Sequence, residues 1–350
     1  MKLDNKRMTQ TTIMEVALAA GVSLATVSRV TNHPEKVKPE TRERIEKIIK
    51  ERGYKPNLNA KSLASSRSTT VAVVVPELTR SSIAGMVDGI ADCAYRRGYL
   101  LRLFVNKSVN TKETGNSKEN EKEFWQTLMS SVVDGVLYIN DEITDEHLDI
   151  IRSSSVPVVL TNTVCSDPNI PFVSIDNFKA AYEITKAMIK RGNKKIWFIS
   201  TIRKYVVNDL KVDGYKKAME EAGLEPCFKN VPGQPELNEK IYRELLKEEH
   251  PEVAIVVRDS MAVSFINVAR LMHISIPEET QVIGFQNTKY AELSRPTLTT
   301  VNTPIYDIGE EAMDLLTKLM NYDYNSEEKE EINTNVYVDY SVIERQSTKK

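Results

Sequence analysis

The first 55 residues carry apolar positions at the spacing of short helices. Residues three or four apart predict a first helix, defined by Ile13, Val16, Ala17 and Ala20 and ended by Gly21. Ser23 is a suitable N-cap for a second helix, in which Val27 and Val30 make a narrow inward stripe. A third helix follows Pro39, with Ile45, Ile48 and Ile49 on one face and Gly53 at its end. The pattern predicts an all-α unit over residues 1–55.

The next segment, PNLNAKSLASS from Pro56 to Ser66, is rich in small and polar residues. Its middle has room for about two helical turns, fewer than an isolated helix needs in water. We expect residues 56–69 to form a hinge and linker that orders only with a partner.

From Thr70 onward, apolar runs alternate with amphipathic segments. The runs predict strands at TVAVVV, LLRLFV, GVLYI, PVVLT, FVSI, KIWFIS, VAIVV, TQVIGF and LTTV. The segments between them predict helices at 84–97, 119–132, 145–152, 178–191, 207–222, 237–248, 260–272 and 304–320. This α/β alternation predicts parallel sheets covered on both faces. The length favours two subdomains with a cleft between them, 70–162 with 288–322 and 163–287 with 323–350.

Charge is divided unevenly between these parts. Residues 1–68 carry 14 Lys and Arg against 7 Asp and Glu, whereas the remainder carries 33 against 42. A basic segment on an acidic body indicates that the first segment meets a polyanion. There is neither an apolar run of eighteen residues nor a secretory leader, so we expect a cytoplasmic protein.

Several catalytic and metal-binding motifs are absent from the sequence. The cysteines are far apart, at Cys93, Cys165 and Cys227, so neither a zinc knuckle nor a CxxC pair is available. No HExxH, serine elbow or Cys-His grouping includes His33, His147, His250 or His273. No GxGxxG follows the first strand, and no GxxxxGK[ST] occurs. We therefore expect no enzyme, no metal and no cofactor.

The first two predicted helices, joined by a glycine turn, form a helix-turn-helix pattern. With Val27 and Val30 inward, the second helix presents outward Leu24, Ala25, Thr26, Ser28, Arg29 and Asn32. Such a helix fits the DNA major groove, which is about 12 Å wide. Leu24 and Ala25 suit base edges, and the polar residues suit phosphates and acceptors on bases. On these residues alone, an ordinary three-helix bundle remains the alternative.

The whole first segment closely resembles the DNA-binding head and hinge of the LacI/GalR family of bacterial regulators. The shared motifs are VA-x-x-AGVS, TVSRV-x-N, V-x-PETRERI, GY-x-PN and A-x-SLA. The likeness continues through the body in VDGVLYI, PVVLTNT, GYKKAMEEAGL, VIGFQNT and RPTLTTV. It implies a transcriptional repressor with a core like the periplasmic binding proteins. It also implies a homodimer that places two heads in successive major grooves of a near-palindromic operator.

Family hinges become helical on DNA and insert a leucine into the minor groove. The resemblance implies hinge contacts with DNA from Asn57, Ala60, Lys61 and Leu63, with Leu63 as the wedge. Asn59 stands where relatives usually carry Val, and Lys61 where many carry Arg. We expect this hinge to order less readily than those of its relatives.

The resemblance also implies an effector site in the cleft of the body. The candidate residues are Ser82, Ile83, Lys211, Arg258, Asp259 and Gln286. Sugar-sensing relatives have an aromatic pair where this chain has Ser82 and Ile83, and an arginine where it has Lys211. Asp259 is retained but also suits the N-cap of helix 260–272, and Arg258 suits either an anion or a nearby carboxylate. We expect the sugar pocket to be mostly lost, and a non-sugar small molecule stays an alternative effector.

A branch of the family that controls carbon catabolite repression uses a Ser-phosphorylated phosphocarrier protein as corepressor. The helix at 304–320 corresponds to its docking helix, with matching positions at Tyr306, Asp307, Asp314 and Lys318. Asp314 replaces a basic residue, and a carboxylate repels a phosphate group. We therefore expect this corepressor not to bind in the usual way, although catabolite control stays an alternative.

Overall fold

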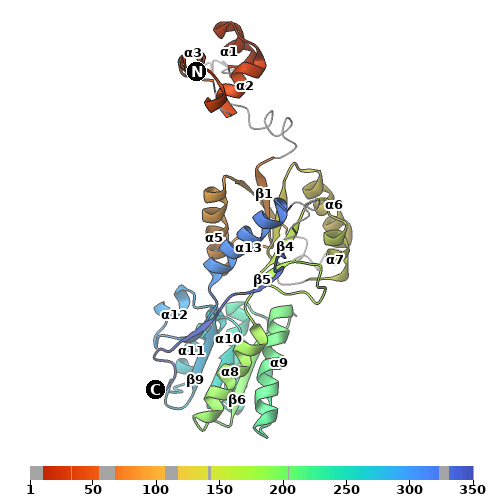
Figure 1. Ribbon diagram of the computed structural model, residues 1–350. Coiled ribbons are helices and arrows are strands. Elements are labelled where there is room, and N and C mark those ends of the chain that lie inside the picture. Colours follow the sequence, from red (N-terminus) through yellow and green to blue (C-terminus); the bar gives the residue numbers. More distant parts are fainter. Residues whose placement is uncertain are drawn as a thin grey trace, which may run out of the picture. The chain divides into compact units, whose positions relative to one another are not determined.

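The computed structural model describes residues 11–32, 34–54, 68–106, 117–140, 143–203, 205–322 and 331–349. The chain divides into two compact units, Met1–Ser68 and Thr69–Lys350, called the head and the body below (Figure 1). The expected hinge contacts Asn57, Ala60, Lys61 and Leu63 lie outside the described residues.

The head has the expected three helices, α1 (Ile13–Ala20), α2 (Leu24–Asn32) and α3 (Pro39–Arg52), with a short 3-10 turn η1 (Pro34–Lys36). A capping box begins α1, where Thr12 Oγ1 accepts from the backbone N–H of Glu15 and the Glu15 carboxylate accepts from that of Thr12. Gly21 and Gly53 end α1 and α3 in the left-handed region, at φ 60° and 61°. The core is made by Val16, Ala17, Ala20, Val27, Val30 and Ile45.

The body contains two six-stranded sheets. The first has the order β11-β5-β4-β3-β1-β2, from β1 (Thr70–Val75), β2 (Leu100–Val105), β3 (Gly135–Tyr138), β4 (Val158–Thr161), β5 (Phe172–Ser174) and β11 (Asn335–Tyr337). The second has the order β12-β10-β9-β8-β6-β7, from β6 (Ile196–Thr201), β7 (Cys227–Val231), β8 (Val253–Val256), β9 (Gln281–Phe285), β10 (Thr299–Asn302) and β12 (Ser341–Ile343). The described pairings are parallel except for that of β12 with β10.

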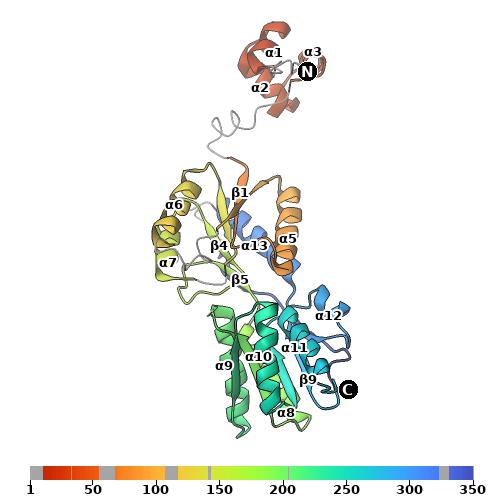
Figure 2. The same cartoon turned by 180° about the vertical axis from the view of Figure 1, so that it is seen from behind.

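Helix pairs cover the faces of both sheets (Figures 1 and 2). On the first sheet, α5 (Ser81–Arg97) pairs with α13 (Ile305–Met320) on one face, and α6 (Ser117–Ser130) and α7 (Asp145–Arg152) lie on the other. Alternate residues of β1 enter these two layers: Val71, Val73 and Val75 face the α5 side, whereas Ala72 and Val74 face Trp125 of α6. On the second sheet, α8 (Asn177–Lys190) and α9 (Val206–Glu221) lie opposite α10 (Pro235–Glu248) and α11 (Asp259–Leu271).

The expected strands and long helices of the body are all present, and the sequence missed four short elements. These are β7, whose sequence CFKNV is only partly apolar and lies at a sheet edge, the three-residue strands β11 and β12, and the five-residue helix α12 (Lys289–Leu293). Elements this short carry too little periodicity to be recognised.

Three strands belong to the sheet of the other subdomain than the one in which the expected boundaries placed them. Strand β5 pairs with β4 in the first sheet, although it falls within the range 163–287 predicted for the second subdomain. Strand β10 belongs to the second sheet rather than with 288–322, and β11 belongs to the first sheet rather than with 323–350. The backbone partners that decide membership are distant in sequence, so the local pattern could not place them.

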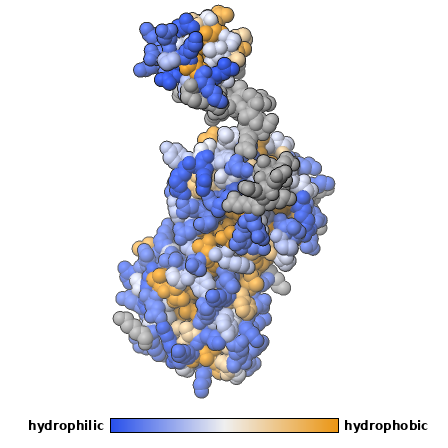
Figure 3. Space-filling view, viewed as in Figure 1, coloured by the Kyte–Doolittle hydropathy of each residue, from blue (hydrophilic) through white to orange (hydrophobic). Residues whose placement is uncertain are grey.

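The surface of the body is largely hydrophilic but exposes apolar side chains in places (Figure 3). Exposed large apolar residues include Leu100 and Leu103 on β2 and Leu271, Tyr290 and Leu293 near α11 and α12. Among the described residues, no single helix is long and apolar enough to cross a membrane, and only the bent pair of α1 with α2 passes that test by length and composition.

Helices α5 and α13 pack backbone against backbone. A Cβ at Gly89 would lie under 3.0 Å from the carbonyl oxygen of Tyr306, and one at Gly309 would lie under 3.0 Å from that of Met86. The two helices therefore approach each other at backbone distance around Met86 and Gly89 of α5.

Substituting Gly89 should reveal this contact. We expect Gly89→Ala to lower the free energy of unfolding of the body by about 1–3 kcal/mol, because the added methyl group meets backbone that cannot move aside. Gly85→Ala is the matched control on the same helix, since its Cβ would meet only the side chain of Ile305, at 3.4 Å from Cγ2 and 3.9 Å from Cβ. Urea unfolding followed by Trp125 and Trp197 fluorescence reports on the body alone, and equal midpoints for the two variants would contradict the close packing.

Candidate DNA-binding face and effector cleft

Helix α2 presents one buried and one exposed side. Val27 and Val30 are buried in the head core, whereas Leu24 is 47% exposed and Ala25 and Arg29 are exposed. Thr26 and Ser28 are half-buried. Asn32 is the last residue of α2, and its side chain lies outside the description. The division of α2 into an inner and an outer side is therefore as the spacing predicts.

Local hydrogen bonds fix the start of this helix. Ser23 Oγ accepts from the backbone N–H of Thr26 at 3.2 Å and lies 2.9 Å from Thr26 Oγ1, so Ser23 is the N-cap. The first turn thus holds two small or apolar side chains outward, with the guanidinium of Arg29 about one turn further on. Apolar contact with base edges and a long cationic donor are the means by which a helix reads the major groove.

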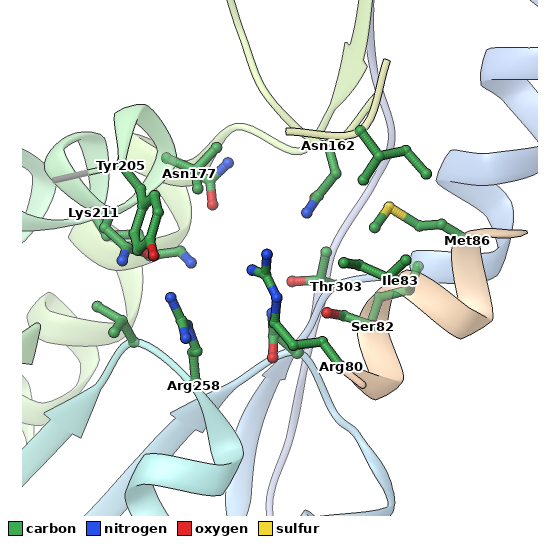
Figure 4. A pocket seen from close by; sticks show the side chains of 16 residues that line it. Arg80, Ser82, Ile83, Met86, Asn162, Asn177, Tyr205, Lys211, Arg258 and Thr303 are labelled. Atoms are coloured by element: carbon green, nitrogen blue, oxygen red, sulfur yellow. The ribbon is translucent and has the colours of Figure 1, made fainter. Parts of the chain in front are cut away.

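A cleft lies between the two sheets of the body (Figure 4). The side chains that line it follow strand ends: Arg80, Ser82, Ile83 and Met86 follow β1, Ile139 follows β3, Asn162 follows β4, Val257 and Arg258 follow β8, Gln286 follows β9, and Thr303 and Ile305 follow β10. Asn177 of α8 and Tyr205, Val207, Asn208 and Lys211 at α9 complete it. Because parallel strands end at one edge of a sheet, loops from many strands meet there and build a ligand site.

Five of the six expected effector residues line this cleft: Ser82, Ile83, Lys211, Arg258 and Gln286. The sequence reading missed the polar residues Arg80, Asn162, Asn177, Tyr205, Asn208 and Thr303. Most of these follow a predicted strand closely, and that position was a usable signal for them.

The cleft is cationic and narrow. Arg80 and Arg258 point into it (Figure 4). Lys211 also lines it, 5% exposed, with its Nζ 4.7 Å from the centre of the Phe285 ring. No Asp or Glu is among the described side chains that line it. The atom-free space measures about 600 Å³, part of it open to solvent, but only about 30 Å³ is wide enough for the centre of a water molecule.

Asp259, the sixth candidate, is neither a helix N-cap nor part of the cleft lining. The N-cap of α11 is Arg258, and no side chain caps that helix. The Asp259 carboxylate is fully buried and accepts from Thr288 N at 2.6 Å, Thr288 Oγ1 at 2.9 Å and Thr300 Oγ1 at 2.7 Å. The carboxylate thus points toward β10 and the loop after β9, and its expected role in ligand binding stays a prediction.

The loop after β9 is held in an unusual conformation beside the cleft. Gln286 and Asn287 both have positive φ, 106° and 54°, where non-glycine residues are strained. Asn287 Oδ1 accepts from Arg345 at 2.9 Å, and Thr288 is bound by Asp259. Asp259 directly follows the cleft residue Arg258 in the chain, and its carboxylate is hydrogen-bonded to the loop that carries Gln286. One buried carboxylate therefore links two residues of the cleft.

The expected corepressor face lies on α13 and α5 and is already occupied by ion pairs. Asp314 pairs with Arg97, and with Lys318 at 2.8 Å. Burial acts to raise the pKa of Asp314, but its bonds to Lys318 and Arg97 outweigh burial and hold that pKa below its ordinary value. Tyr306 donates to Asp92 at 2.7 Å, and Asp307 is exposed. The expected repulsion of a phosphate group by Asp314 stays a prediction, and the two cations beside Asp314 reduce that repulsion.

The described residues contain no group of three or more His, Cys, Asp or Glu side chains placed to hold a metal ion. The three cysteines are all free thiols.

Comparison with known proteins places the chain in a family. The model of the bacterial regulatory proteins of the LacI family matches residues 12–57, and that of a periplasmic binding protein-like domain matches residues 185–348. Catabolite control protein A of Priestia megaterium is 35% identical over 345 residues, covering 97% of this chain and 99% of that protein. The chain belongs to the LacI family of bacterial regulatory proteins.

Solved structures agree with this assignment. The transcriptional regulator CelR in complex with cellobiose matches at 26% identity and TM-score 0.69, over 97% of this chain and 100% of that one. The lac repressor dimer bound to operator and the anti-inducer ONPF matches at 20% identity and TM-score 0.86, over 97% and 99%. The expected resemblance and fold are therefore confirmed. This LacI-family protein is a DNA-binding transcriptional regulator and not an enzyme.

Removing the charge of Asp259 should change how stability depends on pH. Burial raises its pKa from 3.8 to about 6, so the folded chain binds this proton more tightly than the unfolded chain does. The stability it contributes is complete below about pH 4 and is lost as the pH rises through about 6. Asn stays neutral, so Asp259→Asn should gain up to about 3 kcal/mol relative to wild type across that range.

Urea unfolding at a series of pH values, followed by tryptophan fluorescence, measures this difference. A difference between Asp259→Asn and wild type that stays constant with pH would show that the buried carboxyl does not ionise there.

Proposed function

We propose that this LacI-family regulator is a repressor in carbon or sugar metabolism that binds a near-palindromic operator as a homodimer. In this proposal α2 reads the major groove through Leu24, Ala25, Thr26, Ser28, Arg29 and Asn32. The hinge residues Asn57, Ala60, Lys61 and Leu63 contact DNA, with Leu63 in the minor groove. The exposed outer side of α2, held at its start by Ser23, is the observation that carries it. A regulator of the chromosome acts in the cytoplasm.

The homodimer is supported by the surface of the body. Strand β2 is an edge of the first sheet, and it exposes Leu100 and Leu103. An open edge with apolar side chains favours association with another chain. A two-fold dimer presents two identical heads, which is what a near-palindromic site requires.

The signal that controls DNA binding is proposed to enter through the cleft. The structurally similar transcriptional regulator CelR is described in complex with cellobiose, so a sugar is a precedent within this fold. Here, Ser82 and Ile83 provide no aromatic platform, and Lys211 provides an ammonium group instead of a planar guanidinium. We therefore propose a small polar effector other than a neutral sugar.

A second candidate function is catabolite control through a phosphorylated phosphocarrier protein. The relative named catabolite control protein A, aligned over nearly the whole chain, favours it. The ion pairs of Asp314 with Arg97 and Lys318 disfavour it, because those cations are already engaged.

The reading helix is tested by Arg29→Gln. We expect specific operator affinity to fall by about 1–3 kcal/mol, because an amide cannot replace the guanidinium at a base edge or phosphate. Lys47→Gln, at an exposed position of α3, is the matched control for loss of one charge. The measurement is fluorescence anisotropy on an operator selected from a random library, at several salt concentrations. Equal losses for both variants, or affinity independent of salt, would contradict the proposed interface.

The corepressor alternative is tested by binding of a Ser-phosphorylated phosphocarrier protein. We expect wild type to show no preference for the phosphorylated form. Asp314→Asn should create a preference, because Arg97 and Lys318 lose their shared partner and become available to a phosphate. Asp145→Asn on α7 is the charge-matched control. Tight and phosphate-dependent binding by wild type would instead establish the catabolite-control reading.

A further inference from the structure

The chain passes between the two subdomains of the body through short connections. It leaves β5 for α8 at residues 175–176, returns from β10 to α13 at residues 303–304, and crosses from β11 to β12 at residues 338–340. Strand pairing brings the last two connections together, because Asn302 at the end of β10 lies opposite Ser341 at the start of β12. Polar groups that bind Asn302 are therefore placed to control movement of one subdomain against the other.

A series of side-chain hydrogen bonds reaches Asn302 from the C-terminal segment. Arg345 Nη2 donates to Asn287 Oδ1 at 2.9 Å, and Asn287 Nδ2 donates to Asn302 Oδ1 at 3.1 Å. Both ends of the Asn287 amide are thus engaged, which defines its orientation. Asn302 Nδ2 in turn lies 3.5 Å from Ser341 Oγ. The series Arg345–Asn287–Asn302, called the lock below, joins the C-terminal segment to the connection at residues 303–304.

Arg345 is itself held in place. Its Nη1 donates to the carbonyl oxygen of Leu298 at 2.9 Å, and its backbone N–H donates to Thr299 Oγ1 at 2.8 Å. Its Nη2 also lies 3.5 Å from a carboxylate oxygen of Glu292 on α12, and the side chain of Arg345 is only 15% exposed. Hydrogen bonds from a charged donor are stronger than neutral ones, the more so away from water. The guanidinium is therefore a fixed anchor for Asn287.

The lock acts on backbone that is held in a strained conformation. Gln286 and Asn287 have φ angles of 106° and 54°. Asparagine adopts the left-handed region more readily than most residues, whereas a glutamine at 106° is strained. Such strain persists only where surrounding contacts hold the backbone. Loss of the bonds that fix the Asn287 side chain should therefore let this loop relax.

The strained loop also faces the first subdomain. One surface hollow is lined by residues 286–289 after β9, by Ser81 and Gly85 of α5, and by residues 304–307 at the start of α13. The loop belongs to the second subdomain, whereas α5 and α13 cover the sheet of the first. A relaxed loop therefore changes the surroundings of both helix starts.

We propose that the lock holds the two subdomains in one arrangement and so keeps the body pre-organised for operator binding. Hinges between rigid bodies are a few residues at the ends of elements that absorb changes in φ and ψ, which is the position of Gln286, Asn287 and the connection at 303–304. A body confined to one arrangement loses less conformational entropy when it binds DNA. The operator part of this inference rests on the proposed function, whereas the lock itself is a property of the body alone.

Hydrogen exchange of the full chain, compared between wild type and Arg345→Gln, tests the lock. The hydrogen-bonded amides of residues 286–288 should exchange about ten-fold faster or more in the variant, because the shorter neutral side chain cannot bridge Asn287 and Leu298. The first hydrogen-bonded amides of α5 and α13, at Ile83 and Ile308, should also exchange faster. In the described part of the chain, no hydrogen bond or ion pair joins Arg345 to these helices, so a purely local role would leave them unchanged.

A second variant and a matched control accompany this comparison. Asn302→Ala breaks the lock at its other end and replaces Arg345→Gln if that variant does not fold. The double variant should show no larger effect than either single one, because both changes interrupt one series of bonds. Arg191→Gln is the control: Arg191 holds the C-terminal segment through Glu344 and the carbonyl oxygen of Lys349, and its described bonds do not include the loop.

Operator affinity of the same preparations tests the consequence for DNA binding. We expect Arg345→Gln and Asn302→Ala to bind a selected operator about three-fold or more weakly than wild type, because the released body occupies more arrangements. Arg191→Gln should bind as wild type does. Fluorescence anisotropy at one fixed salt concentration measures all of these affinities.

The outcomes separate the lock from the proposed function. Unchanged exchange in Arg345→Gln and Asn302→Ala, faster exchange confined to residues 286–288, or an equal rise in Arg191→Gln would overturn the lock. Faster exchange at both sites with unchanged operator affinity would overturn its role in DNA binding. If wild type binds no operator at all, the proposed function is rejected, and the exchange measurement still decides whether the lock exists.

Discussion

The cleft depends on one constraint, the common direction of the parallel strands. All strands of a parallel sheet end at the same edge, and in the body the loops from both such edges line a single space. Residues as distant in sequence as Arg80 and Thr303 therefore become neighbours. The two antiparallel partners β10 and β12 do not disturb this, because β12 adds only at the outer edge of the second sheet.

Close helix packing and one buried carboxylate then determine how precisely the cleft is built. The glycines Gly89 and Gly309 let α5 and α13 meet at backbone distance, so the cleft residues at the start of α5 sit on a fixed helix. On the other side, Asp259 holds the strained loop that carries Gln286. Burying a carboxylate is costly, and three donated hydrogen bonds offset part of that cost. The buried Asp259 carboxylate therefore positions the Gln286 loop at the cleft.

Much of the fold and part of the site could be predicted from the sequence. The three helices of the head, their glycine ends and the inward Val27 and Val30 follow from local spacing and were found as expected. The long strands of the body were also found as expected, because strands such as TVAVVV are buried on both faces and therefore appear as continuous apolar runs. Ser82, Ile83, Lys211, Arg258 and Gln286 were found through the family resemblance rather than through physical reasoning about the cleft. Arg80, Asn162 and Tyr205 were missed. Each follows a predicted strand, which is a usable signal, but no local pattern shows which residues of such a loop face the cleft.

The sequence by itself determined the LacI-family membership, the helix-turn-helix and the alternation of strands and helices, since each of these depends on residues close together in the chain. The tertiary structure decided which sheet β5, β10 and β11 join, because strand pairing is a contact between distant segments. The tertiary structure also decided which groups surround the carboxylates of Asp314 and Asp259. Asp314 lies between Arg97 and Lys318 and is compensated, and Asp259 turns away from the cleft toward Thr288 and Thr300. The effect of a charge depends on its spatial neighbours, and those neighbours are set only when the chain folds.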